Sequence, residues 1–165
     1  MPSQFAEIER KFLIESFPAN LPLKQRSNVY QAYLSTEPEV RIRRIEADGK
    51  DMAYFLTIKS SGALVRQEVE MSICAEHFYA LAGMEPHSFI EKKFCVYELP
   101  NGLRLECSSV DEGSSFGFMY AEVEFPSVEE AERFVPCFDY VAEVTHCADY
   151  KMKNYWKRTR LKGKL

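Results

Sequence analysis

Charged residues two positions apart recur along this chain, and their types and spacing suit the binding of charged groups. The stretch AEIERKFLI, residues 6–14, alternates charged with apolar side chains, and several later stretches do the same. Successive side chains of a β-strand point to opposite faces, so each stretch would gather its charges on one face. The residues in these sets are Glu7, Glu9 and Lys11; Arg41 and Arg43; Arg66, Glu68 and Glu70; and Glu122 and Glu124.

The sign of the charge differs from one of these stretches to the next. Arginine dominates residues 40–47, and glutamate dominates residues 118–125. For any one strand, a charged face in water over an apolar face in the core is the ordinary explanation. The separation of signs by strand instead favours one enclosed site with an acidic and a basic side, whose polar interior must hold a ligand.

Carboxylates and guanidinium groups together would suit a metal-bound polyphosphate. Glutamate oxygens are hard ligands for Mg²⁺ or Mn²⁺, and guanidinium groups pair with phosphate oxygens through two parallel hydrogen bonds. The metal would bridge carboxylate and phosphate, and basic side chains would balance the remaining charge. Those basic side chains would be Arg41, Arg43, Lys59 and Arg66.

These side chains must be positioned by an antiparallel, strand-rich fold. The alternating stretches, separated by turn signals such as residues 100–102, predict about eight strands connected mostly as hairpins. They cover residues 6–14, 30–35, 40–47, 53–61, 65–73, 89–99, 103–109 and 118–125. Apolar spacing predicts a helix near residues 76–85, Ser127 begins a second with Glu130 three positions on, and a third would run from 149 to about 160. The fold class is therefore α+β, with an antiparallel barrel or a strongly curved sheet.

Composition limits the organisation and the partners of the chain. Its 165 residues, 46% of them hydrophobic, suffice for one core, so we expect a single domain over residues 1–165. A net charge of −4 creates no field that would attract nucleic acid or a membrane. The five cysteines form no Cys-x-x-Cys pair, which argues against disulfides and structural zinc. Without a secretion signal or an apolar run of about 18 residues, the cytoplasm is the expected location.

The motif EIERKF resembles the Glu-x-Glu-x-Lys signature of the CYTH superfamily, the triphosphate tunnel metalloenzymes. Its members include inorganic triphosphatases, thiamine triphosphatases and class IV adenylyl cyclases. Further resemblances follow in order along the chain: VRIRR, LTIKS, RQEVE, AEVEF and EVTHCADY. The pattern is most similar to that of bacterial inorganic triphosphatases. It implies a closed eight-stranded antiparallel barrel, with flanking helices, whose tunnel binds triphosphate and a divalent metal.

The resemblance also implies roles for individual residues. The metal-side carboxylates would be Glu7, Glu9, Glu122 and Glu124, with Glu68 and Glu70 as supporting acids. The triphosphate ligands would be Lys11, Arg41, Arg43, Lys59 and Arg66, and Lys151 resembles a substrate-contacting lysine of the thiamine triphosphatase branch. Lys92 matches a lysine that, in some triphosphatases, works with a tyrosine at the position of Tyr33 to orient the attacking water. A lysine there could lower the pKa of Tyr33 or help place the water, while Tyr33 could equally pack the barrel wall.

The sequence departs from the family pattern in two places. Many bacterial relatives have an arginine where this chain has Phe94, and Lys93 could replace that charge only if the strand register differs. A further strand of the family usually ends in an aspartate on the tunnel face, for which Glu106, Ser108 and Asp111 are all candidates. A second metal site depends on that residue.

Inorganic tripolyphosphate, hydrolysed with Mg²⁺ or Mn²⁺, is the expected substrate because the site needs to bind only the phosphate chain and the metal, with no further group to recognise. The alternatives are a class IV adenylyl cyclase and a thiamine triphosphatase, although the latter branch has an aromatic residue where this chain has Val40. A non-catalytic polyphosphate-binding module is an alternative of another class. The sequence leaves the oligomeric state open, with a homodimer as one option.

Overall fold

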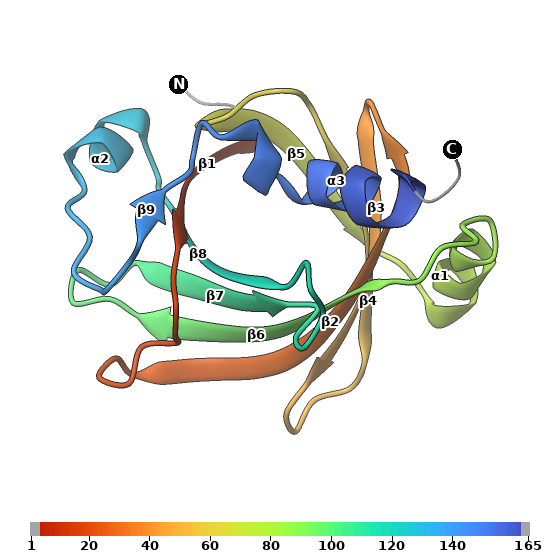
Figure 1. Ribbon diagram of the computed structural model, residues 1–165, viewed down its shortest axis with the longest axis horizontal. Coiled ribbons are helices and arrows are strands. Elements are labelled where there is room, and N and C mark those ends of the chain that lie inside the picture. The colour runs from red at the N-terminus through yellow and green to blue at the C-terminus, as the bar shows by residue number, and fades with distance from the viewer. Residues whose placement is uncertain (1–3, 163–165) are drawn as a thin grey trace.

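Eight strands close into an antiparallel barrel in the computed structural model, which describes residues 4–162 (Figure 1). The strands are β1 (Ala6–Leu13), β2 (Leu23–Thr36), β3 (Glu39–Ala47), β4 (Ala53–Lys59), β5 (Val65–Ser72), β6 (Ile90–Glu98), β7 (Arg104–Val110) and β8 (Phe118–Glu124). Their hydrogen-bonded order is β5-β4-β3-β2-β6-β7-β8-β1, and pairing of β1 with β5 closes the ring. The predicted closed barrel is confirmed.

The barrel turns its charged strand faces inward and its apolar faces outward. On the β1–β8 pair, Glu9 lies opposite Glu124 and Lys11 opposite Glu122, while Phe12 points the other way and is fully buried. The predicted strands overlap the observed ones, but β2 begins at Leu23, seven positions before the predicted start at 30. Its polar first half shows no apolar alternation, and pairing with β6 holds it in the sheet.

One outer face of the barrel is covered by α2 (Val128–Arg133) and the chain that follows it. Ser127 caps this helix, because its hydroxyl accepts a hydrogen bond from the Glu130 amide at 3.2 Å, as the predicted start requires. The short strand β9 (Ala142–Glu143) then pairs with β1. The apolar residues beneath include Phe12, Leu105 and Val123, all fully buried.

The other helices cover a second apolar cluster. Phe78 of α1 (Ala75–Ala82) is fully buried there, and so is Trp156 of α3 (Met152–Trp156). Instead of one continuous third helix, the tail forms a 3₁₀ turn (Ala148–Tyr150), α3 and a π-helical turn (Lys157–Leu161). Asp111 holds this tail against the barrel by accepting hydrogen bonds from the Tyr155 hydroxyl at 2.6 Å and from Arg160 at 2.7 Å.

Within residues 4–162, none of the helices combines the length and the apolar character that crossing a membrane requires.

Candidate active site in the barrel interior

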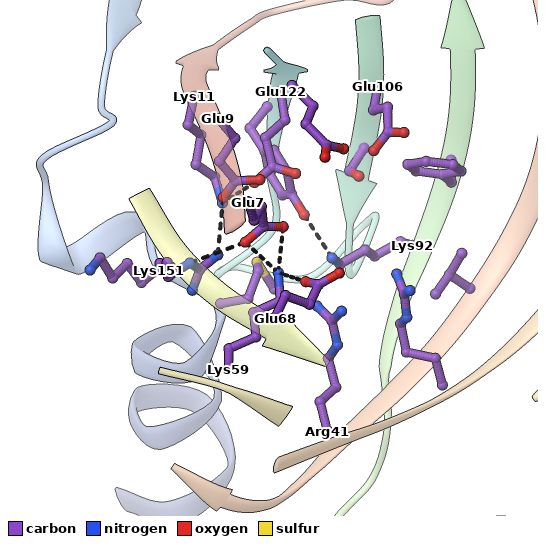
Figure 2. A pocket seen from close by; sticks show the side chains of 18 of the residues that line it. Glu7, Glu9, Lys11, Arg41, Lys59, Glu68, Lys92, Glu106, Glu122 and Lys151 are labelled. Carbon is purple, nitrogen blue, oxygen red and sulfur yellow. Dashed lines mark hydrogen bonds and ion pairs between the residues drawn. The ribbon is translucent and has the colours of Figure 1, made fainter. Parts of the chain in front are cut away.

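A cavity of about 320 Å³ lies inside the barrel, and charged side chains from every strand of the barrel except β2 line it (Figure 2). The basic residues of its wall are Lys11, Arg41, Arg43, Lys59, Arg66, Lys92, Arg104 and Lys151. The acidic residues are Glu7, Glu9, Glu39, Glu68, Glu70, Glu106, Glu122 and Glu124. All the site residues predicted from the sequence are among the residues that line this cavity, except Lys93.

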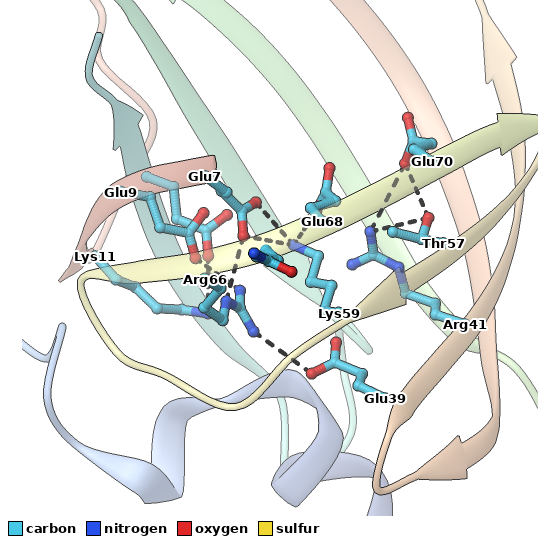
Figure 3. Close-up of polar contacts among 12 residues, drawn as sticks. Glu7, Glu9, Lys11, Glu39, Arg41, Thr57, Lys59, Arg66, Glu68 and Glu70 are labelled. Carbon is cyan, nitrogen blue, oxygen red and sulfur yellow. Dashed lines mark hydrogen bonds and ion pairs between the residues drawn. The ribbon is translucent and has the colours of Figure 1, made fainter. Parts of the chain in front are cut away.

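A network of ion pairs joins β1, β3, β4 and β5 on one side of the cavity (Figure 3). The Lys59 ammonium lies 2.8 Å from a Glu7 oxygen and 2.5 Å from a Glu68 oxygen. Arg66 lies 3.0 Å from Glu9 and 3.4 Å from Glu39. Strand register places Lys59 opposite Glu68 across β4–β5 and Glu7 opposite Arg66 across β1–β5, whereas the Lys59–Glu7 and Arg66–Glu39 contacts reach past an intervening strand.

The two arginines of β3 occupy another part of the wall. Arg43 lies 2.5 Å from Glu70, whose carboxylate also accepts a hydrogen bond from Thr57 at 2.9 Å. Arg41 is 4.0 Å from the same carboxylate. The Nε atoms of Arg41 and Arg43 are buried and have no hydrogen-bond partner in the part of the chain that is described. Buried donors of this kind call for an acceptor, and an anion in the cavity would supply one.

The carboxylates of β1, β7 and β8 lie close together on the side of the cavity that these three adjacent strands form. Burial and the neighbouring Glu122 raise the pKa of Glu9 to about 8 and that of Glu106 to about 7. Burial and Glu7 raise the pKa of Glu124. Burial also opposes ionisation of Glu122, but the ammonium of Lys11 at 3.0 Å and that of Lys92 outweigh it and hold this pKa at about 2. This side therefore carries more carboxylates than the nearby cations balance.

This donor set suits a hard divalent cation. Glutamate oxygens are the ligands that Mg²⁺ and Mn²⁺ prefer, and a cation there would favour the ionised forms of Glu9 and Glu106, whose pKa burial raises. Within residues 4–162, however, no three acidic, histidine or cysteine side chains already stand in a metal-binding arrangement. Glu7, Glu9 and Glu122 are paired with lysines and arginines instead, so metal binding would require some of these pairs to exchange.

Lys92 and Tyr33 both line the cavity, but their polar contacts differ from the expected ones. The Lys92 ammonium donates a hydrogen bond to the Tyr120 hydroxyl at 2.6 Å, whereas the Tyr33 hydroxyl accepts one from Gln31 at 3.2 Å. Burial and the nearby Glu39 raise the pKa of Tyr33. The expectation that a lysine lowers this pKa is therefore wrong for this structure. The Tyr33 ring also packs 5.8 Å from that of Trp156, so it forms part of the wall.

Lys93 points away from the cavity, which corrects its predicted role as a substrate ligand. Since Lys92 and Phe94 face inward, strand alternation turns Lys93 outward, where 63% of its side chain is exposed and it pairs with Glu112. Phe94 therefore stands on the inner wall, where many bacterial relatives have an arginine, and Lys93 does not replace that charge.

Lys151 and Asp111 both fix the C-terminal tail against the barrel. The Lys151 ammonium donates to the carbonyl oxygen of Gly62 and so ties the tail to the loop between β4 and β5. Of the candidates for the family's aspartate, Glu106 and Ser108 line the cavity, whereas Asp111 binds Arg160 and Tyr155. Asp111 is thus a structural anchor for the tail.

Sequence reasoning missed several residues of the wall. Glu39 is buried and pairs with Arg66, Arg104 lies 3.6 Å from Glu106, and Tyr120 contacts Lys92. The alternation contained the signal, because each of them stands two positions before a predicted site residue, namely Arg41, Glu106 and Glu122.

Comparisons with known proteins agree with this geometry. The chain matches no protein-family model. It is 36% identical over 151 residues to an inorganic triphosphatase of Nitrosomonas europaea. The matched region covers 89% of this chain and 94% of that protein. It also resembles the crystal structure of an inorganic triphosphatase, with a TM-score of 0.61 and 33% identity over 90% of this chain and 93% of the other. A protein of Pyrococcus horikoshii OT3 shares the fold alone, with a TM-score of 0.56 and 17% identity over 76% of this chain and 82% of that one.

Proposed function

Because this chain belongs to the CYTH superfamily of triphosphate tunnel enzymes, we propose that it hydrolyses inorganic tripolyphosphate inside its barrel with the help of Mg²⁺ or Mn²⁺. The observation that carries this proposal is the enclosed cavity, in which eight basic and eight acidic side chains face one another. Few ligands other than a metal-bound polyanion would satisfy both sets at once.

Substrate binding would proceed by exchange of ion-pair partners. Phosphate oxygens would replace the carboxylates that now hold Lys59, Arg66 and Arg43, and would also fill the free Nε positions of the two arginines on β3. The full set of proposed phosphate ligands is Lys11, Arg41, Arg43, Lys59, Arg66, Lys92 and Lys151. Arginine suits this task because its planar fork matches two phosphate oxygens.

The carboxylates released by this exchange would hold the metal. We assign this role to Glu7, Glu9, Glu122 and Glu124, and leave Glu68, Glu70 and Glu106 to support the basic residues beside them. When bound, the metal supplies positive charge at the phosphate oxygens.

Hydrolysis would be an in-line attack of water on a terminal phosphorus, which breaks one P–O–P bond and yields orthophosphate and pyrophosphate. Such reactions depend on positioning and charge neutralisation. Here the guanidinium groups would hold the phosphate chain, and the enclosing wall would exclude bulk water. Lys92 and Tyr33 would orient the attacking water from the cavity wall, where both are buried.

The test is a turnover assay with purified protein, Mg²⁺ or Mn²⁺, and tripolyphosphate, ATP or thiamine triphosphate as the substrate. We expect orthophosphate and pyrophosphate from tripolyphosphate. Formation of cyclic AMP from ATP would favour the cyclase, preferred cleavage of thiamine triphosphate would favour that branch, and tight binding without turnover would favour the binding module.

Two variants make the assay specific for the barrel interior. Glu9→Gln should abolish metal-dependent turnover, because it removes one carboxylate charge from the metal side. Lys92→Ala should reduce turnover strongly, whereas Lys93→Ala, on the adjacent but outward-facing position, should not. Equal effects of the two lysine substitutions would contradict the placement of the reaction inside the barrel.

A further inference from the structure

Tyr120 of β8 is a buried tyrosine that lines the cavity between two lysines, although no sequence motif selects it. Only 2% of the residue is exposed. Its hydroxyl accepts the hydrogen bond from Lys92 at 2.6 Å, and its ring lies 3.9 Å beneath the ammonium of Lys11. Two lysines from different strands, β6 and β1, therefore meet on one phenol. Figure 2 shows both lysines reaching toward the cavity.

The pairing of Lys92 differs from that of the other cations nearby. Lys11 pairs with Glu122, Lys59 with Glu7 and Glu68, and Arg43 with Glu70. In the described part of the chain, no carboxylate forms an ion pair with Lys92, and its hydrogen-bond partner is a phenol. A phenol positions an ammonium without cancelling its charge, so the charge of Lys92 stays available to an anion.

Both partners of the Lys92–Tyr120 hydrogen bond are buried, so neither can replace the other with water. Burial and the nearby Glu122 raise the pKa of Tyr120 well above its usual value. Burial lowers the pKa of Lys92 well below its usual value, and the nearby Glu122 opposes this shift only in part. A buried ammonium that lost its hydrogen-bond acceptor would be left unsatisfied until a phosphate arrived, and it would no longer be held in one place.

We propose that Tyr120 is a positioning residue that acts through Lys92: its hydroxyl fixes the Lys92 ammonium toward the phosphate that is attacked, and its ring keeps Lys11 beside it. This inference rests on the proposed triphosphatase function and adds a residue to it. Tyr33 has other partners, since its hydroxyl accepts from Gln31, so the two buried phenols serve different side chains.

A double-mutant cycle tests the proposal. Tyr120→Phe keeps the ring under Lys11 and removes only the hydroxyl. Loss of a hydrogen bond to a charged group predicts that kcat for tripolyphosphate falls about tenfold or more, with a smaller change in KM. In a Lys92→Ala background, the same substitution should have no further effect. Tyr97→Phe is the matched control, because Tyr97 is a buried tyrosine of β6 that packs in the outer cluster away from the cavity.

The alternative, a purely structural role, gives a different result. Tyr120→Phe would then lower the melting midpoint with unchanged kcat, or its effect would add in full to that of Lys92→Ala, and either outcome overturns the proposal. A wild-type protein that releases no phosphate would reject the triphosphatase function itself. The same double-mutant cycle would then be measured by calorimetry, with the Kd for tripolyphosphate in place of kcat. Coupling between the effects of Tyr120→Phe and Lys92→Ala on Kd supports positioning by Tyr120, and additive effects overturn it.

Discussion

Removing the charge of Lys59 should destabilise the barrel far more than removing that of a surface lysine. The Lys59 side chain is 6% exposed and stands between Glu7, 12% exposed, and Glu68, 25% exposed. In Lys59→Met, two inward-facing carboxylates lose their shared cation. Breaking a buried ion pair typically costs about 3–5 kcal/mol. Because Glu68 retains some contact with solvent, we expect a value near the lower end of this range, about 3 kcal/mol.

Urea unfolding measures this loss, and a melting scan should show a fall of about 6–12 °C in Tm, since about 1 kcal/mol corresponds to about 2–4 °C at this chain length. Lys24→Met is the matched control. Lys24 pairs with Glu98 at 2.9 Å, but their side chains are 51% and 50% exposed, so its loss should cost at most about 1 kcal/mol.

The pH dependence of the Lys59→Met defect gives a second check. Burial opposes ionisation of Glu68, but Lys59 holds its pKa below the usual value, and this stabilisation is present above that value and lost as the pH falls. In the variant, Glu7 and Glu68 have lost their shared cation. Ionising both carboxylates as the pH rises then creates a repulsion that lowers the stability of the folded protein. The difference from wild type should therefore be greatest near neutral pH and shrink in acid.

Neutralising the carboxylates as well should restore stability, so the triple variant Glu7→Gln, Lys59→Met, Glu68→Gln should recover most of the loss. A deficit in Lys59→Met no larger than that of Lys24→Met would refute the argument, because it would mean that the inner charges are as well solvated as those on the surface.

Three further predictions concern the tail, the loop at Gly62 and the metal. Burial opposes ionisation of Asp111, but Arg160 holds the pKa of Asp111 below the usual value. The ionised Asp111 therefore stabilises the fold above the usual carboxyl pKa, and this stabilisation is lost as the pH falls. Urea titrations of Asp111→Asn should lack this acid-dependent loss of stability. Gly62 has φ +143°, and an added Cβ would collide with the carbonyl oxygen of Val65, so Gly62→Ala should cost about 1–3 kcal/mol in chemical unfolding; an unchanged midpoint would contradict this close approach. Saturating Mn²⁺ should raise Tm of metal-free protein by about 5–10 °C, and Glu9→Gln should lose most of that rise; an equal rise in both would place the ion elsewhere.

Much of the barrel was predictable because charge alternation marks most of its strands twice, once by an apolar face and once by an ionic face, although β2 lacks the ionic face. The same alternation assigns Lys93 to the outside as soon as Lys92 is placed inside, so this error came from allowing the register to shift. The start of β2 at Leu23 was not predictable, since Lys24 and its polar neighbours form a strand only through pairing with β6.

Contacts across non-adjacent strands lay beyond the sequence pattern. Lys92 is on β6 and Tyr120 is on β8, with β7 between them, so their contact depends on the curvature of the closed barrel. The position of Asp111 depends on local backbone geometry, because a φ of +44° directly after β7 turns its side chain toward the tail. Neither feature leaves a periodic signal.

If the inward-facing acids and bases form one site for a metal-bound triphosphate, the metal and the phosphate chain should be found together inside the barrel. A crystal structure of the Lys92→Ala variant with Mn²⁺ and tripolyphosphate tests it most directly, because anomalous scattering locates the metal. We predict phosphate oxygens on Arg41 and Arg43 inside the barrel, and Mn²⁺ on carboxylates that include Glu9. Tripolyphosphate bound only to the outer surface, with the inner ion pairs intact, would contradict the claim.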